Sequence, residues 1–148
     1  NPFIVSTSDV FKTMIGIEPK KDAVFASDGS KSMFDISGVI GLAGDANGFV
    51  VISMPEALAL KIYESFIGEK KESVDDDVSD AIGEILNMIA GGAKQIFSQN
   101  DLRFKISIPN VVVGKGHSVS KKSDVPSICV KFLVDDMAFV IEASLQES

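Results

Sequence analysis

The segment from Asp80 to Lys94 predicts an amphipathic helix with two very different faces. At about 100° per residue, Asp80, Glu84, Asn87 and Gly91 fall within an arc of roughly 40–60°. A carboxylate pair, a carboxamide and a bare stretch of backbone therefore share one side. The opposite side is apolar, so the helix must lie with that side on a core. The apolar side consists of Val78, Ile82, Ile85, Ile89 and Ile96, flanked by Leu86, Ala93 and Phe97.

The composition is that of one globular domain spanning residues 1–148. Hydrophobic residues make up 45% of the chain and charged residues 24%, which suits a substantial core beneath a charged surface. The formal net charge of −7 disfavours nucleic acid and anionic membranes as partners. No apolar run approaches the roughly 18–20 residues that span a bilayer, and we expect no signal peptide. The single cysteine, Cys129, lies in an alternating apolar segment, so we expect a buried, reduced thiol in a cytoplasmic protein.

The order of helices and strands favours an α+β fold in which helices pack on an antiparallel sheet. Turn residues at 28–30, 44–48 and 135–136 join neighbouring strands, and Pro55 suits the first position of a helix. The regular alternation of single strands and helices that a parallel sheet needs is not present. The predicted helices are residues 3–15, 55–66 and 76–98, and the predicted strands are residues 22–27, 33–42, 49–54, 102–113, 125–134 and 137–145.

The element order also predicts two similar halves, each a helix followed by three strands. Laying residues 13–15 over residues 87–89 matches Thr-Met-Ile with Asn-Met-Ile and places Val10 where Glu84 lies. On this alignment only the second half carries a polar pair on its helix.

Most catalytic chemistries lack the residues that they need in this sequence. A nucleophile–His triad is unsupported, because the chain has one His, one Cys and no nucleophile-elbow pattern. These two residues are too few for a zinc site, and no P-loop is present. His117 lies in a polar loop at residues 114–123 and is expected to be solvated, while the three aspartates at 75–77 suit a helix N-terminus better than a metal site. Hydrolysis by paired carboxylates stays open, but no pair stands out.

Glu84 and Asn87 remain as candidate functional residues, together with the glycines around them. Asn is a poor helix former, and Gly91 and Gly92 each cost about 1 kcal/mol relative to Ala inside a helix. Unfavourable residues concentrated on one exposed face indicate that a partner must approach closely there. Gly83 fits the same interpretation, although tight packing against a neighbouring helix is an alternative. The residues alone thus predict a partner-binding helix.

At these positions the sequence resembles the CheC/CheX/FliY family of bacterial chemotaxis phosphatases. The family motif is an Asp or Ser, three residues, a Glu, two residues and an Asn, and Asp80, Glu84 and Asn87 match that spacing. A Pro follows the motif, and Pro109 stands after 21 intervening residues, one fewer than in CheC. The CheX branch is the most similar, because residues 1–4 and the glycines after Asn87 match it and because CheC usually carries two Glu/Asn pairs.

The resemblance implies an enzyme that dephosphorylates the aspartyl phosphate of a CheY-like response-regulator receiver domain. Asn87 would enter the receiver's site and orient water for in-line attack on phosphorus, as a water-orienting Gln does in GTPases. Glu84 would pair with the receiver's active-site Lys and set the docking register. Asp80, Met88 and Gly91 are expected to line the docking surface.

The same resemblance implies no cofactor on this chain, since Mg²⁺ belongs to the receiver, and a homodimer built partly through sheet edges. A non-catalytic alternative is an adaptor that binds a receiver or a motility component through the same helix face without hydrolysis. A third hypothesis is a structural dimer domain with no receiver partner. The presence of both Glu84 and Asn87 favours the enzyme.

Overall fold

The structure is a computed structural model, and it describes residues 2–27, 35–114 and 127–147. The turn expected at 28–30 and the loop that contains His117 lie outside the described residues. Within the described ranges, the element bounds agree with the sequence-based prediction to within a few residues, except in three places that are given below.

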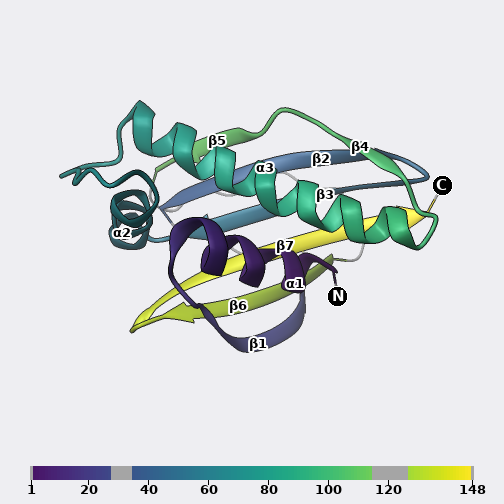
Figure 1. Cartoon of the computed structure of the whole chain (residues 1–148), viewed down its shortest axis with the longest axis horizontal. Coiled ribbons are helices and arrows are strands. Elements are labelled where there is room, and N and C mark those ends of the chain that lie inside the picture. The colour runs from purple at the N-terminus through teal and green to yellow at the C-terminus, as the bar shows by residue number, and fades with distance from the viewer. Residues whose placement is uncertain (1, 28–34, 115–126, 148) are drawn as a thin grey trace.

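In the described residues, seven strands form one antiparallel sheet, in the order β1-β6-β7-β3-β2, and both β4 and β5 pair with the outer side of β2 (Figure 1). The α+β prediction is confirmed, because three helices pack on this sheet. The strands are β1 (Lys20–Ser27), β2 (Ile36–Gly44), β3 (Ala46–Met54), β4 (Phe104–Ile106), β5 (Asn110–Val113), β6 (Ser127–Val134) and β7 (Met137–Glu147).

The strand order reads the same from both ends when the two halves are matched. In this match β1 corresponds to the β4–β5 segment, β2 to β6 and β3 to β7. Replacing each strand by its counterpart gives the same order, read from the other edge of the sheet. The first strand of each half therefore pairs with the second strand of the other half. This agrees with two three-stranded halves. However, Val10 is buried and Glu84 is exposed, so the alignment of residues 13–15 with 87–89 does not match equivalent sides of the two helices.

The helices α1 (Pro2–Val10), α2 (Glu56–Ile67) and α3 (Asp76–Gln99) bury one face of the sheet, and a π-helical turn, η1 (Phe11–Ile15), continues α1. In Figure 1, α1 and α3 cross the same face of the sheet, and α2 lies at one end. The Phe139 ring stacks between Phe11 and Phe132, with centroid separations of 4.7 and 5.1 Å. Cys129 is buried, as expected. None of the described helices is long and apolar enough to cross a membrane.

Two connections differ from the prediction. Pro55 is the N-cap of α2 and not its first helical residue, since its backbone is extended (φ −66°, ψ 154°). Proline has no side-chain acceptor, and the Asp35 carboxylate instead accepts the Glu56 N–H at 3.0 Å. The β2–β3 turn is also tighter than residues 44–48, because only Asp45 separates the two strands.

The third difference lies in the strand predicted over residues 102–113, which is broken into β4 and β5. Pro109 stands at the break, where its missing N–H and fixed φ prevent regular pairing. The Ser107 hydroxyl accepts the Gly41 N–H at 2.8 Å and so satisfies a donor of β2 at the break. This edge of the sheet therefore bends next to α3.

Candidate functional site

A cluster of charges holds the N-terminus of α3, the helix that carries every predicted site residue. Asp75 is the N-cap, and its carboxylate accepts the Val78 N–H at 3.0 Å. The Lys71 ammonium lies 3.0 Å from the carboxylate of Asp75, 3.1 Å from that of Asp77 and 5.9 Å from the centroid of the Tyr63 ring. Hydrogen bonds to both carboxylates raise the pKa of Lys71 above its ordinary value. The bonds from Lys71 and Val78 lower the pKa of Asp75.

The inner face of α3 is locked against the sheet and α1. The predicted apolar residues are buried, apart from Ile96 and Phe97, which are half-buried. The Ser6 hydroxyl of α1 donates to the carbonyl oxygen of Ile89 at 2.6 Å. Near the C-terminus of α3, the centroid of the Phe97 ring lies 5.6 Å from that of the Phe3 ring and 5.7 Å from that of the Phe104 ring. Contacts along its whole length thus fix the position and rotation of α3.

The outer stripe of α3, which we define as Asp80, Glu84, Asn87 and Gly91, faces away from this packing. Asp80 and Glu84 are exposed, whereas Asn87 and Gly91 are half-buried. Successive members are separated by about 6, 4.5 and 6 Å along the helix axis. Among the described residues, the side chains of Asp80, Glu84 and Asn87 have no hydrogen-bond or ion-pair partner. Met88 is half-buried beside the stripe and packs on the core.

The glycines of α3 have three different surroundings, which corrects the interpretation that all of them admit a partner. A Cβ on Gly91 would have no neighbour within 4 Å. A Cβ on Gly92 would lie 2.3 Å from the Ser6 hydroxyl, so this glycine makes room for α1. A Cβ on Gly83 would lie 3.5 Å from Pro109, so Gly83 packs against the broken edge strand and not against a helix. Only Gly91 opens the outer stripe to an approaching molecule.

Two features beside the stripe were not predicted as site residues. Ile108 is 84% exposed next to Pro109, and its sequence context carries no signal of this exposure. Lys94 stands seven residues after Asn87, so it returns to the same side of the helix after two turns. That spacing could have included Lys94 in the stripe.

The outer stripe can bind and orient reactants, but it carries no hydroxyl or thiol nucleophile. The Asn87 amide offers one acceptor and two donors, a combination that suits a water molecule. The Glu84 carboxylate suits a cationic group about one helical turn away. Within the described ranges, no three acidic, His or Cys residues group in a way that could hold a metal ion. A rigid helix with a carboxylate and a carboxamide on its open side fits positioning of reactants supplied by another molecule.

The sequence and the structure both match known chemotaxis proteins. The family model for chemotaxis phosphatase CheX matches residues 36–133. The chain belongs to this family. The CheY-P phosphatase CheX of Thermotoga maritima is 28% identical over 116 residues, which cover 78% of this chain and 75% of that protein. The crystal structure of the chemotaxis protein CheX from Vibrio vulnificus has a TM-score of 0.91 at 34% identity, covering 99% of this chain and 97% of that one. CheX in the CheX-CheY-BeF3-Mg²⁺ complex from Borrelia burgdorferi has a TM-score of 0.84 at 25% identity, covering 99% and 96%.

Proposed function

We propose that this chain dephosphorylates the aspartyl phosphate of a CheY-like receiver domain, with Asn87 as the residue that positions water. The observation that carries the proposal is the carboxylate and carboxamide pair, one turn apart on the open side of a helix fixed along its length. Membership of the CheX family supports it. So do the name of the Thermotoga relative, a CheY-P phosphatase, and the Borrelia complex, in which CheX is bound to CheY.

The reaction needs a water molecule in line with the bond that breaks. The water oxygen bonds to phosphorus, the bond between phosphorus and the aspartyl oxygen breaks, and the receiver regains its carboxylate. The proton of the water passes to the released inorganic phosphate. The Asn87 amide oxygen accepts a hydrogen bond from the water and holds it in line. No covalent intermediate on this chain is required, which suits the absence of a hydroxyl or thiol from the outer stripe.

Glu84 has a different role from Asn87. Its carboxylate pairs with the active-site Lys of the receiver and so docks that domain. Asp80, Met88 and Gly91 line the docking surface around Glu84. The chain itself supplies no cofactor, and Mg²⁺ is held by the receiver. A receiver partner also implies a cytoplasmic location.

The test is the decay of a phosphorylated receiver in the presence of this protein. Asn87→Ala is expected to lower kcat by about 100-fold or more, since the water loses its position, while the protein still binds the receiver. Glu84→Ala is expected mainly to raise KM. The control is Gln146→Ala, which removes an exposed amide on β7, outside the outer stripe and outside β4 and β5. This variant should behave as wild type.

Two results would contradict the assignment. Full activity of Asn87→Ala would remove Asn87 from the reaction. Binding of the receiver by the wild type without faster loss of phosphate would favour the adaptor hypothesis over the enzyme.

We also propose a homodimer that joins through β1. Among the described strands, β1 is an edge strand that pairs with β6 alone; its register shifts once, between Lys21 and Ala23, and Val24 beyond that shift is 52% exposed. The opposite edge is broken at Pro109 and lies beside the docking surface. A dimer through β1 leaves both docking surfaces free.

A further inference from the structure

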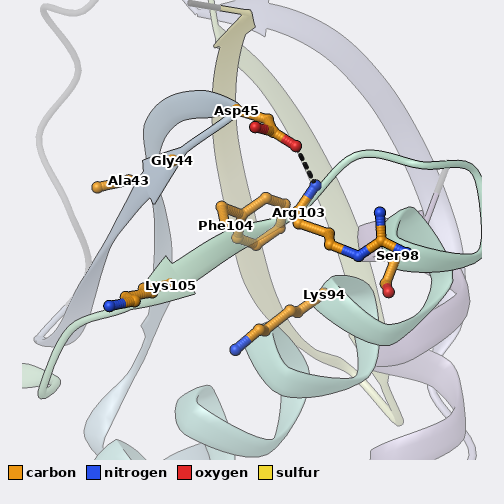
Figure 2. Close-up of a pocket in the computed structure, with 8 residues that line it drawn as sticks. All are labelled: Ala43, Gly44, Asp45, Lys94, Ser98, Arg103, Phe104 and Lys105. Carbon is orange, nitrogen blue, oxygen red and sulfur yellow. Dashed lines mark hydrogen bonds between the residues drawn. The ribbon is translucent and has the colours of Figure 1, made fainter.

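The outer stripe of α3 leads into a cationic pocket at the C-terminal part of the helix. Beyond Gly91, the spacing of the stripe continues through Lys94 and Ser98. These two residues form one wall of a pocket of about 440 Å³ (Figure 2). Residues 103–105 of the β4 segment and the β2–β3 turn at residues 43–45 complete it. The pocket is therefore built from segments far apart in the sequence.

The pocket has a surplus of positive charge in a chain whose net charge is −7. Lys94, Arg103 and Lys105 line it, against one acidic residue, Asp45. The Asp45 carboxylate already accepts the backbone N–H of Arg103 at 3.0 Å (Figure 2). The guanidinium of Arg103 is 3.9 Å from the exposed carboxylate of Asp101, at the limit of an ion pair.

The two lysines are the cations that stay available to a ligand. Within the described part of the chain, neither Lys94 nor Lys105 forms an ion pair. Figure 2 shows Lys94 extending from α3 and Lys105 extending from β4 beside Ala43, whereas Arg103 reaches toward Ser98. Phe104 lies between Arg103 and Lys105 in the chain, and its buried ring anchors this segment against Phe97.

A protein that docks with its interface centred on Asn87 reaches the Lys94 wall of this pocket. Lys94 follows Asn87 by seven residues, or about 10 Å along the helix axis. A protein interface of ordinary size covers about 800 Å² on each partner, which as a disc has a radius of about 16 Å. Centred on Asn87, such a footprint includes Glu84 on one side and Lys94 on the other.

We propose that the pocket binds an acidic surface segment of the docked receiver and so fixes the rotation of the receiver about Asn87. This inference rests on the proposed function and names a second contact for it. The docking surface is negative at Asp80 and Glu84 and positive at Lys94 and Lys105, so its charge has a direction. A receiver that presents a cation to Glu84 can place an acidic segment on the pocket in one orientation only. Complementary charges of this kind set orientation and association rate.

The experiment measures KM and kcat for a phosphorylated receiver on which the wild type is active. The double variant Lys94→Glu/Lys105→Glu is expected to raise KM by about tenfold, with kcat changed less than about twofold. The milder Lys94→Gln/Lys105→Gln covers the case in which charge reversal prevents folding, and it should raise KM by about threefold. The control Lys12→Glu makes the same type of charge change at an exposed lysine of η1, outside both the pocket and β1, and should leave KM unchanged.

Salt provides a second readout that a purely structural role would not move. The wild-type KM should rise between about 50 and about 200 mM salt, because the contact is exposed to screening. The rise should be smaller in the Gln variant. An unchanged KM in both double variants, or a loss of thermal stability alone, would overturn the proposal and leave Lys94 as a favourable charge toward the C-terminus of α3. Inhibition by inorganic phosphate that disappears in the variants while KM stays constant would make the pocket a small-anion site and would also overturn it.

The two proposals can fail separately. If the wild type does not accelerate phosphate loss, the proposed function fails, and binding of a BeF3-activated receiver by the same variants still tests the pocket. If the wild type is active and the double variants keep its KM and salt dependence, the pocket proposal alone fails.

Discussion

Gly91 and Gly92 are neighbours in the chain but have opposite surroundings. Gly91 faces open space on the outer stripe, and Gly92 faces the buried Ser6 hydroxyl on α1. Both residues lower the intrinsic stability of the helix. Only one of them is required by the packing of the molecule itself, so the other is the candidate for a role in docking.

Alanine at each position is therefore expected to change stability in opposite directions. Gly91→Ala should increase the free energy of unfolding by about 0.5–1 kcal/mol, since a helix gains from Ala and nothing is in the way. Gly92→Ala should lower it by about 1 kcal/mol, because displacing Ser6 breaks its buried bond to Ile89 and this outweighs the gain in helix propensity. Urea unfolding of both variants measures the difference.

The cause of the Gly92 effect can be isolated by removing the hydroxyl that lies in the way. In a Ser6→Ala background, Gly92→Ala should cost less than it does alone. Equal costs in the two backgrounds would contradict the contact with Ser6. If Gly91→Ala also raises KM for the receiver while stabilising the fold, Gly91 belongs to the docking surface.

At the scale of the element, the charge cluster around Lys71 determines how α3 begins. Asp75 caps the helix, Asp76 and Asp77 lie in its first turn, and Asp75 and Asp77 form ion pairs with Lys71. The prediction that these aspartates suit a helix N-terminus is confirmed. The Lys71 side chain, which lies in the α2–α3 connection, was not predicted as their partner. Its pKa is raised by Asp75 and Asp77, and that of Asp75 is lowered by Lys71.

Lys71→Met is expected to lower stability at neutral pH and to flatten the acid limb of the stability profile. The carboxylate of Asp75 has a lower pKa when folded, so its contribution is present above the ordinary Asp value of about 3.9 and is lost as the pH falls through the folded pKa. The gap between wild type and variant should thus be constant near neutral pH and close below about pH 4.

Thermal unfolding at a series of pH values checks this expectation. Lys70→Met, at the adjacent exposed lysine, is the matched control and should leave the profile unchanged. A gap that persists at low pH would mean that Lys71 acts through its contact with the Tyr63 ring and not through the carboxylates.

At the scale of the whole molecule, the sheet has two unequal edges. The β4–β5 edge is split in two at Pro109 and faces the docking surface, while β1 is a single strand of eight residues with one register shift, between Lys21 and Ala23. The longer edge strand is the better template for pairing with a second copy.

Val24→Lys is expected to convert the proposed dimer into a monomer, because a charged side chain on an edge strand opposes pairing with a second chain. Val113→Lys, at a similarly exposed valine on β5, is the control and should leave the dimer intact. Light scattering coupled to gel filtration measures the mass. A monomeric wild type would contradict the dimer, and a monomer produced only by Val113→Lys would place the interface at the other edge.

Local patterns were enough to predict much of this protein. The period of α3, its buried side, the outward direction of Asp80, Glu84 and Asn87, and most of the strands follow from the spacing of apolar residues over a few turns. The motif spacing led to the correct family for the same reason, since it is contained in one helix. Each of these features depends on residues that are close in the sequence.

The tertiary structure decided the features that depend on contacts between distant segments. These are the exchange of first strands between the two halves, the separate roles of Gly83, Gly91 and Gly92, and the pocket that joins Lys94 to Lys105. Nothing near Gly92 in the sequence indicates Ser6, and nothing near Lys94 indicates the β2–β3 turn. The sequence alone determines which side of α3 is open, and packing determines which of its glycines a partner can reach and which cations stand beside them.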